Sequence, residues 1–244
     1  MRIGLIGAGN MAGALARGWG EPVLATDNGS GRAKALVDEL GGEVCASNAA
    51  LAEQADLVVL GVKPYQLEAI AAETQAARRV LSILGGTTVE QLRAAYPDAE
   101  VYATLPNTPV EVRRGITIVA EETPLADDAR ELLERVGLVV VLPERLMGPA
   151  TATTGVTPAY VALVAEAMID AAVKHGLKAD LAADLVTEVL AGSAELLRAR
   201  GGDTLAMRRE VTSPGGSTAR GLAALENAGL RTAFLDAIEA VRNP

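Results

Sequence analysis

Short β-branched runs alternate with Ala-rich helical stretches over the first 150 residues of the chain. Alternation of this kind is typical of βαβ units, in which a largely parallel sheet carries helices on both faces. It predicts an N-terminal α/β domain over residues 1–150, with a doubly wound, mostly parallel Rossmann sheet. The expected strands are 2–7, 22–26, 57–62, 79–84, 100–105, 116–120 and 138–142, and the expected helices lie at about 10–20, 31–40, 48–54, 65–77, 88–95 and 125–135.

The pattern changes after residue 150. Apolar positions recur at helical spacing from Pro158 to Lys174, and Gly176 follows as a stop. Further helices are expected at 179–199 and from Leu205, Thr218 and Leu230, so residues 151–244 form an all-α domain. The 158–174 helix is apolar on more than one face, which suits the centre of a helical bundle, a subunit interface, or both.

Composition narrows the class of protein. Half of the residues are hydrophobic, and a net charge of −9 disfavours nucleic acid or an anionic membrane as a partner. We expect no membrane span and no signal peptide, and therefore a cytoplasmic protein. A single cysteine, Cys45, and a single histidine, His175, disfavour a disulfide, a metal site and a Ser-His-Asp triad. This composition favours a protein that uses a borrowed cofactor and no metal.

A glycine-rich turn follows the first expected strand. The segment Gly7–Ala12 has the G-x-G-x-x-A form: Gly7 permits the tight turn, Gly9 lets the backbone approach a pyrophosphate, and Ala12 allows close packing of helix on strand. A purely structural turn is the alternative. The strand-turn-helix context favours a dinucleotide site, with phosphates at the helix N-terminus.

Asp27 stands about 20 positions after Gly7, at the end of the second strand. Three interpretations are open. Its carboxylate accepts the ribose 2′-hydroxyl of NAD(H); or the segment Asn28–Arg32 holds a 2′-phosphate, with Arg32 as the counter-charge; or Asp27 only caps the 31–40 helix.

Other segments at strand ends are expected to line the same edge of the sheet. They are Gly61–Pro64, Leu84–Thr87 and Leu105–Pro109. Each segment also suits a simple turn. On that interpretation Lys63 is a surface residue at a turn, and Asn107 only stabilises its turn. In the helical domain, the turn Ser213–Ser217 precedes a helix and leaves backbone N–H groups for a substrate carboxylate, unless the helix is merely well capped.

In sequence and order, these blocks resemble the pyrroline-5-carboxylate reductase family. The resemblance spans nearly the whole chain, from IGLIGAGNMAGALARG through GVKPYQL, LSILGGTT and LPNTPVEVRRGIT to VTSPGGSTARGLAALENAGLRTAFLDAI, of which the last block is the most specific. It implies reduction of 1-pyrroline-5-carboxylate to L-proline, a C-terminal domain whose helices intertwine with a partner subunit, and NADP(H) as cofactor, with NAD(H) as the alternative. It also implies that the hydroxyl of Thr218 contacts the ring nitrogen, that Asn48 and Val62–Pro64 lie at the cofactor, and that Glu144 lies near the substrate. Glu144 is otherwise simply a solvated charge.

Motifs and resemblance together define the candidate site. The cofactor residues are Gly7, Ala8, Gly9, Asn10, Met11, Asp27, Asn28, Asn48, Val62, Lys63, Pro64 and Gly85. The substrate residues are Glu144, Ser213, Gly215, Gly216, Ser217 and Thr218, and Thr218 is also the catalytic candidate.

Departures from the family pattern affect substrate and cofactor choice more than fold. Val156 and Thr157 replace a small hydroxyl residue and a glycine, Leu105 replaces a methionine, Gly148 replaces an aspartate, and Asp27 replaces residues that suit a 2′-phosphate better. Three other functions therefore stay open. They are reduction of a related cyclic imine acid, a 3-hydroxyacid or 6-phosphogluconate type of dehydrogenase, and a non-catalytic dinucleotide-binding homologue.

Overall fold

The computed structural model describes residues 1–242, and the chain divides into two compact units, Met1–Pro158 and Ala159–Pro244. The division falls after Pro158, whereas the sequence pattern placed it after residue 150. The difference arises from helix α7 (Glu144–Thr154), whose Met147 and Ala150 pack into the core of the first unit.

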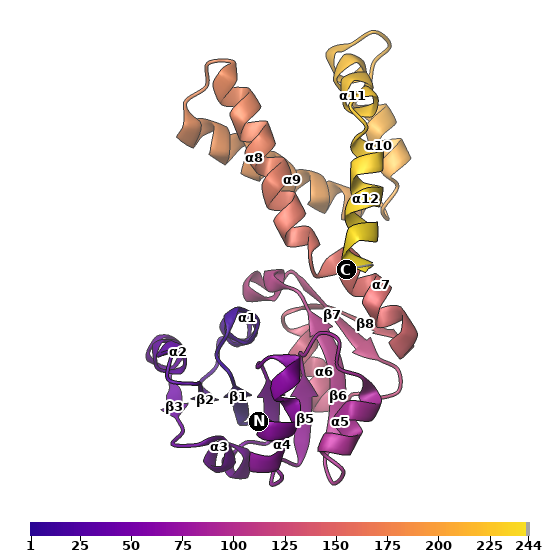
Figure 1. Cartoon of the computed structure of the whole chain (residues 1–244). Helices are drawn as coiled ribbons and strands as arrows, with labels where there is room; N and C mark the ends of the chain where they lie inside the picture. The colour runs from indigo at the N-terminus through magenta and orange to yellow at the C-terminus, as the bar shows by residue number, and fades with distance from the viewer. Residues whose placement is uncertain (243–244) are drawn as a thin grey trace. The chain divides into compact units, whose positions relative to one another are not determined.

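The first unit is built on one eight-stranded sheet (Figure 1). The strand order is β3-β2-β1-β4-β5-β6-β7-β8, and every neighbouring pair is parallel except β6 and β7. The predicted doubly wound, mostly parallel Rossmann sheet is therefore confirmed. The strands are β1 (Ile3–Ile6), β2 (Val23–Thr26), β3 (Gly42–Val44), β4 (Leu57–Leu60), β5 (Arg79–Ser82), β6 (Glu100–Pro106), β7 (Gly115–Ala120) and β8 (Gly137–Leu142).

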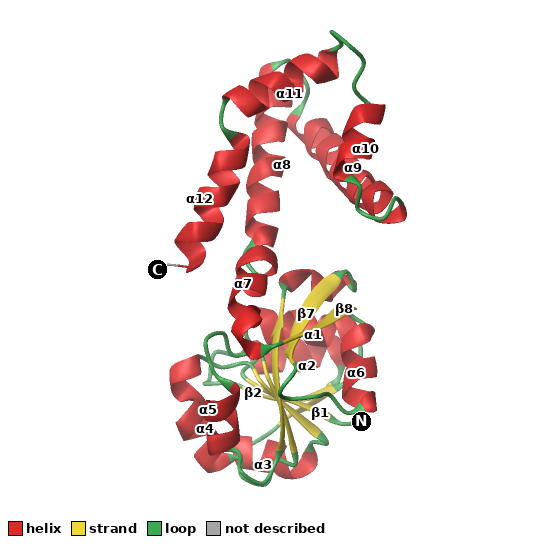
Figure 2. Ribbon diagram, turned by 90° about the vertical axis from the view of Figure 1, so that its right-hand side faces the viewer, coloured by secondary structure: helices red, strands yellow, loops and turns green. Residues whose placement is uncertain are grey.

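Helices cover both faces of the sheet, because its central strands are apolar on both sides. In β1, Leu5 belongs to one core cluster and Ile6 to the other. The first cluster includes buried residues of α1 (Asn10–Trp19), α2 (Arg32–Leu40) and α6 (Asp127–Glu134). The second includes residues of α3 (Asn48–Gln54), α4 (Leu67–Glu73), α5 (Val89–Ala95) and α7. Figure 2 shows the strands between these helices.

Two regular elements of this unit were not predicted from the sequence. Strand β3 is three exposed residues at the sheet edge, too short to show an alternating pattern. Helix α7 contains Gly148 and Pro149, which are poor helix formers, so its sequence favours a loop. Short 3-10 turns also occur at η1 (Pro64–Gln66) and η2 (Thr108–Val112), and η1 replaces the start of the expected 65–77 helix.

The second unit is entirely helical in the part that the structure describes, as predicted. Its helices are α8 (Thr157–Lys174), α9 (Ala179–Ala199), α10 (Thr204–Glu210), α11 (Ser217–Asn227) and α12 (Leu230–Arg242). Between Ala159 and Arg242 only Ala182 and Val186 are buried, whereas Leu163 is 64% exposed and Leu185 is 52% exposed. This unit has little core of its own.

One stretch is apolar enough to span a membrane by length and composition alone. Residues Glu144–Lys174 contain an 18-residue window with a mean hydropathy of 1.5. The expectation of no membrane span therefore cannot rest on the lack of such a stretch, and it stays a prediction. The stretch is not one uninterrupted helix, because α7 ends at Thr154 and α8 begins at Thr157.

Helix α1 is held tightly in the first unit. Trp19 at its end is 1% exposed, and its indole N–H donates to the carbonyl oxygen of Leu132 at 3.1 Å. A Cβ atom at Gly18 would collide with the backbone carbonyl of Val110 in η2, whereas one at Gly13 would meet only the flexible end of Arg17, at 3.4 Å. Two glycines of one helix therefore have different reasons to be there.

Replacing these two glycines should have opposite effects on stability. Gly18→Ala should lower the free energy of unfolding by about 1–3 kcal/mol, because backbone must move to admit the methyl group. Gly13→Ala should leave stability unchanged or raise it by up to about 1 kcal/mol, because alanine favours the helix. Thermal unfolding of the two variants checks this, and an equal loss in both would contradict it.

Candidate functional site

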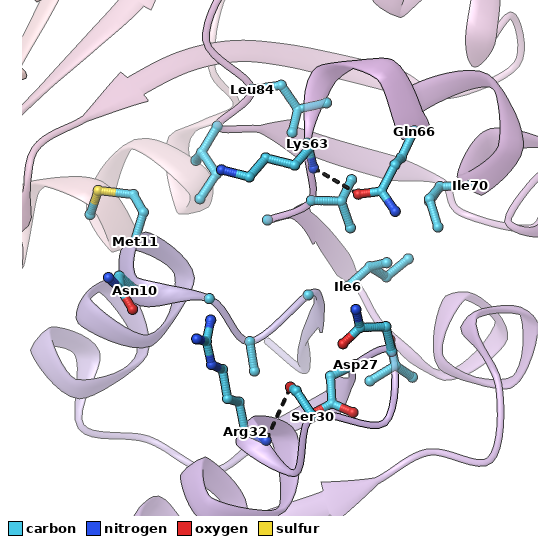
Figure 3. Close-up of a pocket in the computed structure, with 18 of the residues that line it drawn as sticks. Ile6, Asn10, Met11, Asp27, Ser30, Arg32, Lys63, Gln66, Ile70 and Leu84 are labelled. Atoms are coloured by element: carbon cyan, nitrogen blue, oxygen red, sulfur yellow. Dashed lines mark hydrogen bonds between the residues drawn. The ribbon is translucent and has the colours of Figure 1, made fainter.

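A cleft of about 630 Å³ lies at the carboxyl ends of β1, β2, β4 and β5 (Figure 3). The strand order reverses at β1 and β4, since the chain runs outward to β2 and β3 on one side and to β5 on the other. Ligands of open α/β sheets bind at such a switch point. All twelve residues predicted for the cofactor line this one cleft: Gly7, Ala8, Gly9, Asn10, Met11, Asp27, Asn28, Asn48, Val62, Lys63, Pro64 and Gly85.

The glycine turn forms the floor of the cleft. Gly7 has φ +91°, and a Cβ there would lie 2.8 Å from the carbonyl oxygen of Gly61. Gly9 differs, because its Cβ would lie 3.8 Å from the nearest protein atom, so the protein's own packing does not require a glycine. No side chain caps the N-terminus of α1. A missing side chain beside uncapped N–H groups fits the close approach of a pyrophosphate.

Asp27 lies at the rim of the cleft and bonds to its own loop. Its Oδ1 accepts the N–H of Gly29 at 2.8 Å, and its Oδ2 accepts the Ser30 hydroxyl and the N–H of Ala33, both at 2.9 Å. These hydrogen bonds, above all the one from Ala33, lower the pKa of Asp27 below its ordinary value. The carboxylate thus caps α2, whose N-cap residue Gly31 has no side chain to do so.

Two cations face the cleft from different elements. Arg32, the first residue of α2, and Lys63, after β4, both line it, and Figure 3 shows their side chains extending into it. Among residues 1–242, neither side chain forms an ion pair. In a chain of net charge −9, two unpaired cations in one cleft favour an anionic ligand.

Asn48 is fixed by neighbours on two sides. Its Oδ1 accepts the hydroxyl of Thr26 at 2.6 Å, and its Nδ2 donates to Glu73 at 2.8 Å. One Nδ2 hydrogen is left for a ligand in the cleft. Thr26 and Glu73 were not among the residues predicted from the sequence. Only the position of Thr26 at the end of β2 could have indicated that it lies near the cleft.

Glu144 lies outside this cleft. It lines a neighbouring cavity of about 490 Å³ together with Leu105 and Gly148. Its Oε1 accepts the N–H of Val89, the first residue of α5, at 2.7 Å, and its own N–H donates to the carboxylate of Glu122. Glu144 is the first residue of α7, so its bond to Val89 links the N-terminus of α7 to that of α5.

Asn107 serves its turn. Its Oδ1 accepts the N–H of Ile116 at 2.7 Å, and its Nδ2 donates to the carbonyl of Thr154 at 3.1 Å. The side chain is 8% exposed, so it ties the end of β6 to β7 and α7 rather than facing a ligand.

The predicted substrate residues of the second unit gather at the start of α11. Gly215 has φ +68°, and the N-cap residue Gly216 leaves the helix without a side-chain cap. A Cβ at Gly216 would meet the hydroxyl of Ser213, which can rotate away, and would lie 3.1 Å from the Ser213 carbonyl oxygen, so the turn is tight at this glycine. Ser217 and Thr218 form the first turn of the helix. The turn therefore leaves backbone N–H groups open to an anion.

Comparison with known proteins covers both units. A family model described as "NADP oxidoreductase coenzyme F420-dependent" matches residues 2–86, and one described as "Pyrroline-5-carboxylate reductase dimerisation" matches residues 144–243. The pyrroline-5-carboxylate reductase of Synechocystis is 33% identical over 98% of this chain and 95% of its own length. The chain belongs to the pyrroline-5-carboxylate reductase family. Human pyrroline-5-carboxylate reductase 2 is another relative, 32% identical over 98% of this chain and 81% of its own length.

Solved structures of the pyrroline-5-carboxylate reductase family have the same fold. The Plasmodium falciparum enzyme with NADP bound matches with a TM-score of 0.85 and 27% identity, over 99% of this chain and 95% of that one. The Coxiella burnetii enzyme matches with the same TM-score and 29% identity, over 99% and 96%. The resemblance read from the sequence blocks is therefore confirmed at the level of family and fold.

The bonds of Asp27 predict a pH dependence. Because its pKa is lowered by folding, its contribution to stability is complete above the unfolded pKa, near 4, and is lost as the pH falls through the folded pKa. Asp27→Asn should therefore lower the melting temperature at pH 7, and the gap to the unaltered chain should narrow below about pH 4. Thermal unfolding from pH 7 to 3 measures the gap. A gap that stays constant with pH would contradict this role for the charge.

Proposed function

We propose that this chain reduces 1-pyrroline-5-carboxylate to L-proline at the expense of NADPH. The observation that carries the proposal is the cleft at the strand switch point. There, position 9 is a glycine although the protein's own packing leaves room for a side chain, and the N-terminus of α1 has no side-chain cap. The second support is the uncapped turn at α11, which suits an acidic substrate and lies within the segment that matches the family's dimerisation model.

The residues of the cleft fit a reduced dinucleotide. When bound, such a cofactor supplies the hydride that reduces the C=N bond. The turn Gly7–Asn10 would hold the pyrophosphate at the N-terminus of α1. Lys63, which follows β4, and Arg32, at the start of α2, would supply positive charge for the phosphates. The NADP-dependent family model over residues 2–86 and the NADP bound to the Plasmodium relative support NADP(H).

At α11, we assign the backbone N–H groups of Gly215 and Ser217 to the substrate carboxylate. The N–H of Gly216, which the sequence also predicted for this role, instead donates to the carbonyl oxygen of Ser213 at 3.0 Å and closes the turn. The Thr218 hydroxyl orients the ring nitrogen. The imine nitrogen can be protonated in solution before the hydride is transferred. The protein therefore contributes orientation of the substrate, and it does not need a general acid with a shifted pKa.

We also propose that the chain acts as a homodimer or a higher homo-oligomer. The support is the second unit, in which only two residues between Ala159 and Arg242 are buried. Leu163 and Leu185 are more than half exposed and lie within the segment that matches the dimerisation model. The same pairing of α8 with a partner would cover the part of the apolar stretch Glu144–Lys174 that lies in α8. A cytoplasmic location suits the single buried thiol, Cys45.

The activity is tested by following oxidation of NADPH and NADH by the purified chain with pyrroline-5-carboxylate, and with the six-membered piperideine analogue in parallel. Turnover of the five-membered imine to proline is expected. Reduction of the six-membered imine alone would move the substrate assignment and direct attention to Val156 and Thr157. Binding of NADPH without reduction of either imine would overturn the reductase proposal.

Within the same assay, Thr218→Ala should lower kcat/KM about 100-fold through loss of orientation, with NADPH affinity unchanged. Thr204→Ala makes the same change at the first residue of α10 and serves as the control. Equal activity of the two variants would remove Thr218 from the reaction.

The oligomer is tested by placing a charge on the exposed face of α8. Leu163→Glu should shift the chain to monomers in sedimentation at micromolar concentration, because an unpaired charge cannot be buried cheaply. Leu138→Glu makes the same change at a side chain of β8 that is 61% exposed and lies outside the dimerisation segment, and it should leave the oligomer intact. A monomeric parent chain, or one that sediments with membranes, would contradict the proposal.

A further inference from the structure

The Asp27 carboxylate has little capacity left for a ribose. A carboxylate offers about four acceptor sites over its two oxygens. Three are taken, because Oδ2 accepts from Ser30 and Ala33 while Oδ1 accepts from Gly29. A ribose diol that binds both oxygens of an aspartate would have to displace the bonds that cap α2.

Those bonds fix the course of the loop. Gly29 and Gly31 have φ values of +86° and +77°, and no protein atom lies within 4 Å of the place where a Cβ would stand at either residue. Residues 28–32 are all exposed, so little packing holds the loop. Its anchors are the hydrogen bonds from the residues around it to Asp27.

The loop presents Arg32 to the cleft. Arg32 is the first residue of α2, where the helix dipole disfavours a positive charge unless an anion joins it. Figure 3 shows its side chain extending into the cleft, away from the Asp27 carboxylate. The Ser30 side chain lines the same cleft and stands between the two.

We propose that Asp27 is a positioning residue, not a ribose ligand: it holds the Asn28–Arg32 loop so that Arg32 binds the 2′-phosphate of NADP(H), and the cleft thereby prefers NADP(H) to NAD(H). The inference rests on the dinucleotide site of the proposed function and deepens it by naming the residues that set cofactor choice. It also gives the aspartate at this position a role compatible with a nearby phosphate, because Arg32 supplies the counter-charge.

The test is the binding of 2′,5′-ADP and 5′-AMP, which differ by the 2′-phosphate, to the full chain by titration calorimetry. Arg32→Gln should weaken 2′,5′-ADP about 10- to 100-fold, the range expected for a charge-assisted pair, and change 5′-AMP by less than about 2-fold. Lys34→Gln is the matched control, because Lys34 lies two residues further along α2 and pairs with Asp38. A 2′,5′-ADP affinity that is equal in all three chains would overturn the proposal.

Asp27→Asn separates the possible roles of this residue. The amide loses acceptors for Ser30, Ala33 or Gly29, so the loop should loosen, and 2′,5′-ADP should weaken while 5′-AMP holds. A ribose ligand would predict weaker binding of both nucleotides, and a repelling charge would predict tighter binding of 2′,5′-ADP; either result overturns the positioning role. A merely structural role would not alter the ratio of the two affinities.

These titrations need no imine reduction. Dependence of 2′,5′-ADP binding on Arg32 in a chain that reduces no imine would sustain this inference while the proposed reaction failed. A working reductase whose KM ratio for NADPH and NADH is unmoved by Arg32→Gln would do the reverse.

Discussion

The site depends on the close approach of two backbones at the strand switch point. A Cβ at Gly7 would lie 2.8 Å from the carbonyl oxygen of Gly61, and one at Gly61 would lie 2.5 Å from that of Gly7. Hydrogen bonds from Gly7 N to Thr26 O and from Gly61 N to Ile6 O hold the ends of β2, β1 and β4 in this contact. With no side chains between them, the strand ends form a continuous floor on which a dinucleotide fits.

The two units meet opposite physical requirements. The first buries a large core on both faces of its sheet, and this core supports the strand ends that form the cleft. The second leaves most of the apolar surface of its long helices uncovered. Helices of this kind become a core only against other helices, so we infer that the second unit, which carries the proposed substrate turn, depends on assembly for its packing.

Local backbone requirements made much of this architecture predictable from the sequence. The glycine turn was predictable because its backbone requires particular residues. The long strands and α8 to α12 were predictable because each shows the apolar pattern of its element. Strand β3 and α7 were missed because edge pairing and packing on β7 hold them against weak local preference. Capping of the 31–40 helix by Asp27 was one of three interpretations among which the sequence could not choose. The bond from Val89 to Glu144 was beyond prediction, because it depends on which N–H groups the fold brings within 3 Å of a carboxylate.

The character of the cleft fits a reaction driven by orientation. Asp27 lines the cleft, and its pKa is lowered below the ordinary value. Its carboxylate accepts hydrogen bonds from the loop at the start of α2. Arg32 and Lys63 are cations suited to phosphates, and Asn48 is held in one orientation by Thr26 and Glu73. The chain's single histidine follows α8 in the second unit. An imine that takes its proton from solvent needs to be oriented for hydride transfer, and fixed hydrogen-bond donors and fixed charges supply that orientation.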